Sequence, residues 1–337
     1  MLRYLAALLM VAAAVSCDAT TSPSAANDSS AELAVGGLTF TRNADISIES
    51  EELSIALDAV TVRYQFLNRS ARPVTLTVAF PLPDIDLADA ANAAFPASDP
   101  LNFVGFSTKI DGKPIAFVIN QQAFLDSKDV TAKLSEMGIP MFPVGTQQMK
   151  ISELPQKTRD RAVSEGLLVE SGTSDKGLPL YDATWTLKTS VVRQQTFPPG
   201  RSISVEHRYR SSVGLSFDSV LRRSLRQNKA MEAEVQRYKT TFCVNDDFLR
   251  LVDTLESSDR ASRTGIIERR ISYVLKTGAN WAGPIKYFHL VVDKGRAGNI
   301  VSFCGQGIKQ ISATQFELRA TDFTPTQDLN VLILGPR

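Results

Sequence analysis

The sequence contains few residues of the kinds that perform catalysis or bind metals. Two histidines occur, His207 and His289, and neither has a third histidine, a cysteine or an aspartate at the short spacings typical of zinc ligands. The chain also lacks a Gly-x-Ser-x-Gly nucleophile elbow and a glycine-rich phosphate loop. We therefore predict no catalytic residue, no metal and no cofactor, although a triad whose members are distant in the chain stays open.

The two histidines fall differently within their local patterns. His207 is in register with Val205 and Tyr209, so it faces the apolar side of its strand, where a hydrogen-bonded core imidazole is commoner than a ligand or a general base. His289 alternates with the apolar set that contains Phe288 and Leu290, and we expect it on the opposite side of that strand.

Two further groups of residues have the chemistry of a binding site. Asp84, Asp86 and Asp89 offer hard oxygens to calcium, but an EF-hand loop requires Gly and Glu at positions occupied here by Asp89 and Phe95, so a surface loop is the better interpretation. Trp281 lies between glycines and is the aromatic residue best placed for display on a loop, against a sugar or in a partner's pocket. The alternative is that Trp281 folds back over the core of a C-terminal domain.

Cysteine usage predicts one disulfide in an exported chain. Cys243 and Cys304 each occur in a strand-like segment and form an even pair once Cys17 is removed or modified. The alternative is two separate buried thiols, since a free cysteine packs as a small hydrophobic residue.

The N-terminal segment 1–26 has the pattern of a signal peptide. Arg3 supplies the positive charge, and the apolar run over 5–15 is too short to span a bilayer. Cleavage after Ala26 would release a periplasmic or secreted chain. The competing site is a lipobox ending at Cys17, which would give a membrane-anchored lipoprotein with a lipid on that residue. We favour cleavage after Ala26.

Composition and charge limit the partners. The chain has 337 residues, of which 43% are hydrophobic and 22% charged, as in ordinary globular proteins. Thirty-seven basic residues against 36 acidic ones leave a formal charge of +1, so no global field attracts nucleic acid. The mature chain is expected to have no transmembrane span, and its partner is expected to be an envelope protein or a glycan.

Alternating hydrophobic residues predict a mainly β protein. Residues 61–80 are typical of a hairpin, with polar turn residues between two strands of period two. A second hairpin is expected around Asp111-Gly112, the dipeptide that suits a tight turn.

We predict four segments in the chain. A signal peptide over 1–26 precedes a β-sandwich domain over 27–215, which carries a helical insertion at about 121–168. A linking helix over 216–240 follows, with an apolar face and a basic face that is best interpreted as solvated. A smaller β domain occupies 241–337.

Several segments resemble a bacterial exported family known as domain of unknown function 4424. The resemblance covers most of the chain after the leader, and its clearest segments are Asn27–Phe40, Tyr64–Asn68, Val78–Asp84, Tyr273–Trp281 and Phe303-Cys304. That family has no established activity or catalytic residues to transfer to this chain.

The N-terminal part also resembles, more distantly, the vault and inter-α-trypsin inhibitor (VIT) domain, a β-sandwich often placed beside an adhesion module. The resemblance follows the order of Asn68, Phe80–Pro83, Ile110–Ile115, Pro199-Gly200 and Val205–Tyr209. The Asp-x-Ser-x-Ser adhesion motif is absent from the sequence.

Together these patterns favour an exported, non-enzymatic binding or scaffolding module of the cell envelope. One alternative is an envelope hydrolase that acts on glycan or peptide, and another is a lipid-anchored structural lipoprotein. The hydrolase predicts a concave pocket with an accessible histidine or perturbed acids.

Overall fold

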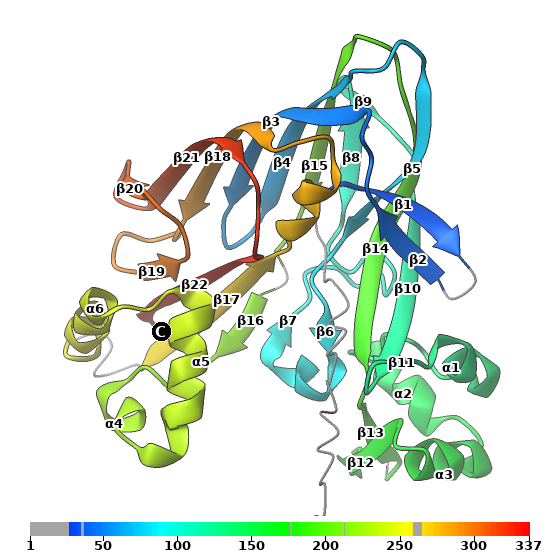
Figure 1. The fold of residues 1–337 in the computed structure, drawn as a ribbon. Helices are drawn as coiled ribbons and strands as arrows, with labels where there is room; N and C mark the ends of the chain where they lie inside the picture. The colour runs from blue at the N-terminus through cyan, green and yellow to red at the C-terminus, as the bar shows by residue number, and fades with distance from the viewer. Residues whose placement is uncertain (1–26, 35–36, 176, 212, 259–264) are drawn as a thin grey trace, which may run out of the picture.

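The computed structural model describes residues 27–34, 37–175, 177–211, 213–258 and 265–337 (Figure 1). It is mainly β, with several largely antiparallel sheets and a few helices, which confirms the predicted fold class. The predicted signal peptide lies outside the described residues. No helix in the described part of the chain is both long enough and apolar enough to cross a membrane.

Two large sheets form the body of the molecule. The seven-stranded sheet runs in the order β11 (Lys128–Asp129), β10 (Val118–Leu125), β14 (Thr186–Phe197), β5 (Val74–Pro81), β1 (Ser29–Ala34) and β2 (Gly37–Thr41), with β6 (Ile85–Asp86) beside β14. The eight-stranded sheet runs β20 (Lys309–Gln310), β21 (Gln315–Phe323), β18 (Ile285–Asp293), β3 (Ile46–Ile55), β4 (Val60–Asn68), β15 (Ser202–Tyr209), β8 (Ser107–Ile110) and β9 (Lys113–Pro114).

These sheets pack face to face because each strand buries alternate residues. On β4 the side chains of Val62, Tyr64 and Phe66 are fully buried. Across the interface, the ring of Phe80 on β5 lies 4.9 Å from the imidazole of His207 on β15. The sandwich predicted for the N-terminal part is therefore present.

A third sheet closes one end of the sandwich. It runs β19 (Ile300–Phe303), β22 (Leu329–Pro336), β17 (Ile266–Tyr273), β16 (Val213–Ser216) and β7 (Ala93–Ala94). The hydroxyl of Tyr273 on β17 lies 3.1 Å from that of Tyr64 on β4, inside the core. A small pair, β12 (Leu168–Thr173) and β13 (Pro179–Ala183), stands apart.

The hairpin predicted over 61–80 is wrong, although both of its strands exist. β4 pairs with β3 and β15, whereas β5 pairs with β1 and β14 in the opposite sheet. The polar connection between them crosses the sandwich, and the Asn68 side chain supports the crossing by donating to the carbonyl oxygens of Arg72 and Phe197, both at 2.8 Å. Alternation shows which face of a strand is buried, but not which strand is its neighbour.

The second predicted turn is confirmed. β8 and β9 pair across Asp111-Gly112, and both turn residues have positive φ, 47° and 77°. Such a turn requires this backbone at both central positions, and Asp-Gly tolerates it well. The strand after the turn then leaves for the other sheet as β10.

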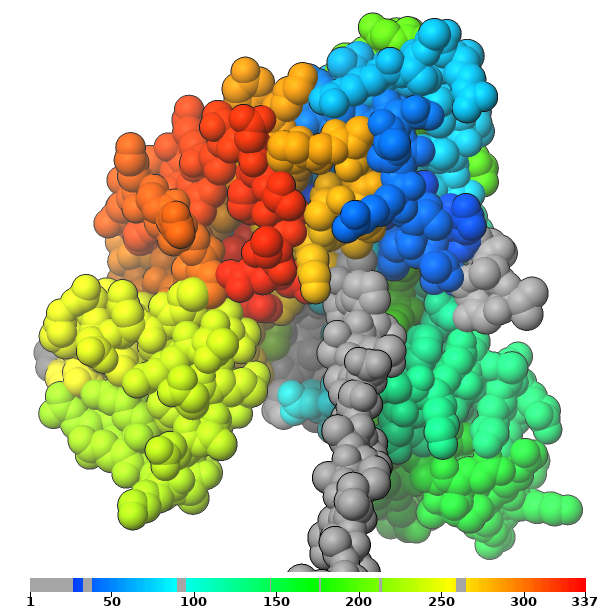
Figure 2. Space-filling model, viewed as in Figure 1, coloured from blue at the N-terminus to red at the C-terminus, as the bar shows by residue number. Residues whose placement is uncertain are grey.

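Helices gather in two groups at one end of the sandwich (Figure 1). The first group is α1 (Thr131–Met137), α2 (Thr146–Ser152) and α3 (Gln156–Ser164), which confirms the predicted helical insertion. The second is α4 (Arg223–Arg226), η2 (Lys229–Met231), α5 (Glu232–Phe242) and α6 (Asp246–Glu256). The short 3-10 segments η1 (Leu87–Asn92) and η3 (Lys276–Asn280) complete the set. Figure 2 shows the two groups as separate masses in this view.

The linking helix expected over 216–240 is broken into α4, η2 and α5. The side chain of Asn228 accepts a hydrogen bond from the backbone N–H of Ala230 and starts a new segment there. Phe217, expected on the apolar face, is 58% exposed. The expected basic face is neutralised locally, because Arg222 pairs with Glu256 and Arg226 pairs with Asp253 of α6.

The C-terminal segment shares its sheets with the N-terminal one. β18 runs parallel to β3 in the eight-stranded sheet, and β17 pairs with β16 in the five-stranded sheet. One hydrophobic cluster extends from Ile46 to Ile333. The sheets and the core therefore cross the predicted boundary at 240.

Candidate functional site

A polar pocket of about 410 Å³ lies between β6, η1, α5 and the five-stranded sheet. Asp84, Asp86 and Asp89 supply acidic groups to its lining, and Arg237 of α5 and Arg270 of β17 supply basic ones. We call it the acid–arginine pocket. Its volume is in the range of small-molecule sites.

Strand alternation sets the acidic part of the lining. Ile85 of β6 is buried in the core, so the side chains of its neighbours Asp84, just before the strand, and Asp86 are expected on the opposite side from that core. The carboxylate of Asp86 accepts the backbone N–H of Ala88 at 3.0 Å at the start of η1. The aspartates predicted as a surface loop therefore contribute to a pocket.

The basic part is held by a buried carboxylate. Glu268 and Arg270 share one face of β17, and Arg270 donates from Nη1 to Glu268 Oε1 at 2.9 Å and to the Tyr238 hydroxyl at 2.8 Å. Tyr238 in turn donates to Glu268 Oε1 at 2.5 Å. Glu268 is 1% exposed and therefore has a fixed position in the protein interior. Its bond to Arg270, together with that of Tyr238, holds the guanidinium group in place.

Burial and charge shift two pKa values at this site. Burial raises the pKa of Asp84, and the ammonium of Lys188, 3.5 Å from Asp84 Oδ2, opposes that shift. Burial, followed by the carboxylate of Glu268, raises the pKa of Tyr238 to about 12, so its hydroxyl stays a donor. The pocket can thus offer carboxylates to a cationic group and guanidinium donors to an anionic group of the same ligand.

A second cluster of charges is completely buried near Asp28. We call it the N-terminal charge cluster, and its members are Asn27, Asp28, Glu51, Arg193 and His207. Arg193 donates from Nη1 and Nη2 to the two oxygens of Asp28 at 3.0 and 2.6 Å. His207 Nε2 lies 3.1 Å from Asp28 Oδ2. No member is more than 4% exposed.

The pKa values in this cluster follow from burial and pairing. Burial raises the pKa of Asp28, but Arg193 and then His207 outweigh it and hold that pKa below its usual range. Burial lowers the pKa of His207 despite the neighbouring Asp28. The stable arrangement is an ionised Asp28–Arg193 pair with a neutral imidazole.

His207 is therefore the core imidazole that its register predicts, and it is 0% exposed. It does not meet the hydrolase alternative's requirement for a histidine accessible in a cleft. His289 lies on the opposite side of its strand from the buried set, as expected, and its Nε2 is 2.9 Å from Glu317 Oε1.

The interpretation of Trp281 as a displayed ligand contact is wrong. Its side chain is buried, with the residue 4% exposed, and its indole Nε1 donates to the carbonyl oxygen of Asp28 at 2.5 Å. Its ring lies 5.0 Å from that of Phe66 and 6.0 Å from that of Phe197. The alternative is right that Trp281 folds back over a core, but that core is shared with the sandwich and is not a separate C-terminal one.

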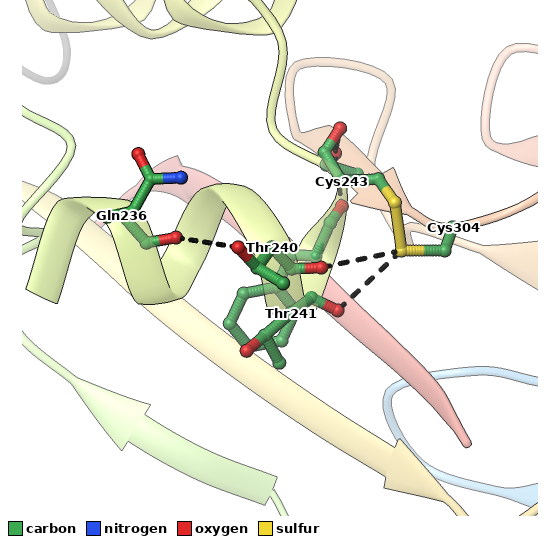
Figure 3. The surroundings of a disulfide bond; sticks show 7 residues. Gln236, Thr240, Thr241, Cys243 and Cys304 are labelled. Carbon is green, nitrogen blue, oxygen red and sulfur yellow. Dashed lines mark hydrogen bonds between the residues drawn. A yellow bond between two sulfur atoms is a disulfide. The ribbon is translucent and has the colours of Figure 1, made fainter. Parts of the chain in front are cut away.

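Cys243 and Cys304 form the disulfide that the sequence predicts (Figure 3), with an S–S distance of 2.12 Å and Cα atoms 5.1 Å apart. Cys243 caps the C-terminal end of α5, and Cys304 directly follows β19. Thr241, in the last turn of α5, places its carbonyl oxygen 3.8 Å from Cys304 Sγ. The bond fastens the second helix group to the five-stranded sheet.

Metal ligands do not gather in the part of the chain that the structure describes: no group of three or more His, Cys, Asp or Glu residues there is arranged to hold an ion. An apolar pocket of about 310 Å³ lies beside the disulfide, with Phe288, Leu290 and Leu318 in its lining.

Comparison with known proteins identifies the family. The model of a domain of unknown function, DUF4424, matches residues 26–332. The chain belongs to the DUF4424 family. No curated protein matches it.

Two kinds of solved structure are similar to the DUF4424 chain in arrangement. A Legionella pneumophila protein described as a "putative nutrient binding protein" is 15% identical, with a TM-score of 0.46, over 92% of this chain and 70% of that one. An M1 zinc metallopeptidase from Deinococcus radiodurans is 8% identical, with a TM-score of 0.28, over 88% of this chain and 44% of that one. The chain thus spans less than half the length of the peptidase. Neither similarity carries an argument about function.

Sequence reasoning considered the three aspartates of the acid–arginine pocket but not its arginines, and it missed the N-terminal charge cluster. Glu51 and Arg193 lie on strands, and a single sequence does not reveal a distant partner. One available signal was the position of His207 on an apolar strand face, since a buried imidazole needs a hydrogen-bonding partner.

Proposed function

We propose that this DUF4424 protein is an exported, non-enzymatic binding module that takes a small polar ligand in the acid–arginine pocket. The observation that carries the proposal is the presence of three aspartates and two arginines around one cavity of about 410 Å³. Such sites use a few placed polar groups to orient a ligand.

The charges favour a zwitterion, such as an amino acid or a short peptide. Asp84 and Asp86 provide acceptors for an ammonium group, and Arg237 and Arg270 provide donors for a carboxylate. Ser272 and Asn330, joined by a hydrogen bond of 2.8 Å, add neutral polar groups to the lining. A zwitterion offers a group of opposite charge to both the aspartates and the arginines, whereas a ligand with a single charge would interact favourably with only one of the two kinds.

The disulfide supports the exported location, because such bonds persist mainly in oxidising compartments. The predicted signal peptide points in the same direction. The sequence predicts an envelope protein or a glycan as the partner. We propose that this partner supplies the polar ligand.

Calorimetry on the disulfide-bonded chain tests the pocket. The panel contains amino acids, dipeptides, neutral sugars and inorganic phosphate, and we expect saturable binding of zwitterions. Asp86→Asn, which keeps the oxygen that accepts the Ala88 N–H, and Arg237→Gln should each weaken binding by about tenfold or more, because each removes a charge-assisted hydrogen bond.

Matched controls come from outside the pocket. Arg161→Gln removes a helix arginine paired along its own helix with Glu165, as Arg237 is paired with Glu234. Asp129→Asn keeps an oxygen for the backbone N–H of Thr131. Both controls should bind like the parent. Absence of binding to every compound would overturn the pocket assignment, and release of amino acids from the dipeptides would replace it with the hydrolase.

A further inference from the structure

Asn27 and Asp28, the first residues that the structure describes, are buried within the core. Both are 0% exposed. The backbone N–H of Asn27 donates to Thr277 Oγ1 at 2.7 Å, and the hydroxyl of Thr277 donates back to the carbonyl oxygen of Asn27 at 2.9 Å. Trp281 also donates to the Asp28 carbonyl oxygen, so the backbone of this segment is bonded to Thr277 and Trp281. The side chains of Asn27 and Asp28 bond to Glu51 of β3 and Arg193 of β14.

Glu51 on β3 is a buried acid without a cation. Its Oε2 accepts from Asn27 Nδ2 at 3.0 Å, and among the described residues it has no ion pair. Two oxygen acceptors of the cluster lack a hydrogen-bond donor in that part of the chain, Glu51 Oε1 and Asn27 Oδ1, and Nδ1 of His207 has no partner there either. The cluster's own cation, Arg193, is taken up by both oxygens of Asp28.

We propose that hydrolysis of the Ala26–Asn27 peptide bond creates an α-ammonium group that remains in this core as the counter-ion of Glu51. An envelope peptidase of the signal-peptidase class adds water across the amide bond. The hydroxyl goes to the carbonyl carbon of Ala26, which leaves as a carboxylate, and the nitrogen of Asn27 becomes an ammonium group by taking up two protons. No oxidation or reduction occurs.

The hydrogen-bond inventory matches this step. A backbone amide has one N–H, which Thr277 already accepts, whereas an ammonium group has three. Cleavage therefore adds two donors at Asn27, the residue that carries one of these acceptors and whose side chain bonds to the carboxyl group of Glu51 that carries the other. It also adds one positive charge to a cluster in which the carboxylate of Asp28 disfavours ionisation of Glu51.

None of the other groups described around Glu51 supplies it with a positive charge. Tyr64 and Tyr273 face it from β4 and β17, and burial raises both of their pKa values well above the usual range, so they stay neutral. His207 has a lowered pKa and is neutral as well. Arg193 donates to both oxygens of Asp28, and no positive charge in the cluster lowers the pKa of Glu51.

The pH dependence follows from the pKa of Glu51. In the uncleaved chain burial raises that pKa to about 8, and Asp28 adds to the effect. The unfolded chain ionises near 4.5, so the stability contributed by the neutral carboxyl is lost as pH rises from about 4.5 to 8. An adjacent ammonium group lowers this pKa and removes most of that loss.

The experiment compares two disulfide-bonded chains, one that begins at Asn27 and one that begins at Ala26, each released from a fusion that leaves no other residue. The extra residue moves the ammonium group by about 3.8 Å along the chain. We expect the chain that begins at Asn27 to have the higher urea midpoint at pH 7.5, with the difference shrinking at pH 4.5.

Glu51→Gln should abolish the difference between the two chains, and Glu52→Gln, at the exposed neighbouring position, should leave it unchanged. Equal midpoints, or a difference that survives Glu51→Gln, would overturn the proposal. If Glu51→Gln does not fold, acylation of the α-amine at pH 7.5 decides: the folded Asn27 chain should react at least tenfold more slowly than the Ala26 chain, and equal rates would overturn it.

Intact mass of the exported protein tests the cleavage itself. A chain that begins at Asn27 agrees with the proposal, and a lipid on Cys17 with an intact Ala26–Asn27 bond overturns it. The proposal uses the exported location but not the ligand of the acid–arginine pocket. Zwitterion binding to either chain therefore reports on the proposed function separately.

Discussion

At the scale of single residues, the buried pair Asp28–Arg193 is the most consequential interaction in the structure. A buried ion pair contributes little compared with a well-packed apolar pair, but removing one partner strands the other charge. Arg193 is 4% exposed and makes both of its guanidinium N–H contacts to Asp28. The carboxylate of Asp28 therefore allows the charged side chain of Arg193 to be buried between the sheets.

Asp28→Asn should destabilise the protein by about 3–5 kcal/mol at neutral pH, because the cation of Arg193 would remain buried without a counter-ion. The folded-state pKa of Asp28 is lowered, so the contribution of this carboxylate is present above the unfolded pKa of about 3.8 and is lost as pH falls below it. Urea unfolding at pH 7 and pH 3 measures both effects.

The matched control is Asp58→Asn, at an exposed position. It should change stability by about 0.5 kcal/mol or less, as most surface substitutions do. A cost for Asp28→Asn as small as that of the control would contradict the assigned role of the pair.

The sequence predicted some residue environments and missed others. The register of His207 and the pairing of Cys243 with Cys304 followed from local patterns and from cysteine arithmetic. Asp28 and Arg193 are 165 positions apart, and neither carries a local sign of burial. The glycines that flank Trp281 suggested display on a loop, with a buried Trp281 as the alternative, and its indole N–H in fact donates to a buried carbonyl group.

At the scale of elements, strand alternation predicted strands more reliably than their neighbours. The sequences of β4 and β5 both alternate with the expected period of two, yet the strands belong to opposite sheets. Their buried faces meet across the core, and a hairpin would have placed them side by side. The linking helix predicted over 216–240 is wrong for a related reason. Its apolar residues were taken as one continuous face, but the cap at Asn228 divides the segment.

The disulfide joins two secondary-structure elements, because it links the end of α5 to the end of β19 across a sequence separation of 61. The chain-entropy relation assigns about 4 kcal/mol to a closed loop of that length. The double substitution Cys243→Ala with Cys304→Ala should therefore lower the free energy of unfolding by about that amount, measured by urea denaturation.

Reduction provides the control. Dithiothreitol should bring the parent protein to the stability of the double variant and should leave the variant itself unchanged. A parent protein with the same urea midpoint before and after complete reduction would show that the bond does not constrain the unfolded chain.

At the scale of the whole molecule, the sheets join segments that the sequence assigned to separate domains. β18 lies between β3 and β21, so its partner on one side comes from the first part of the chain. Hydrophobic alternation and turn residues are local signals. Neither of them indicates that β3 and β18, which are more than 200 positions apart, pair in parallel. This is why fold class was predictable and domain organisation was not.

The residues 241–337 should accordingly fail to fold alone. Without β3, the strand β18 would present an unpaired edge, and the side chains of Leu290 and Val292, now buried in the common core, would lose their cover. The isolated segment should show an unfolded NMR spectrum and no cooperative thermal transition, whereas the chain 27–337 should unfold in one step.

For the chain 27–337, unfolding curves measured by far-UV circular dichroism and by the fluorescence of the buried Trp185 and Trp281 should coincide. A dispersed spectrum for 241–337, or two separate transitions in the longer chain, would show that the shared sheet does not make the segments interdependent.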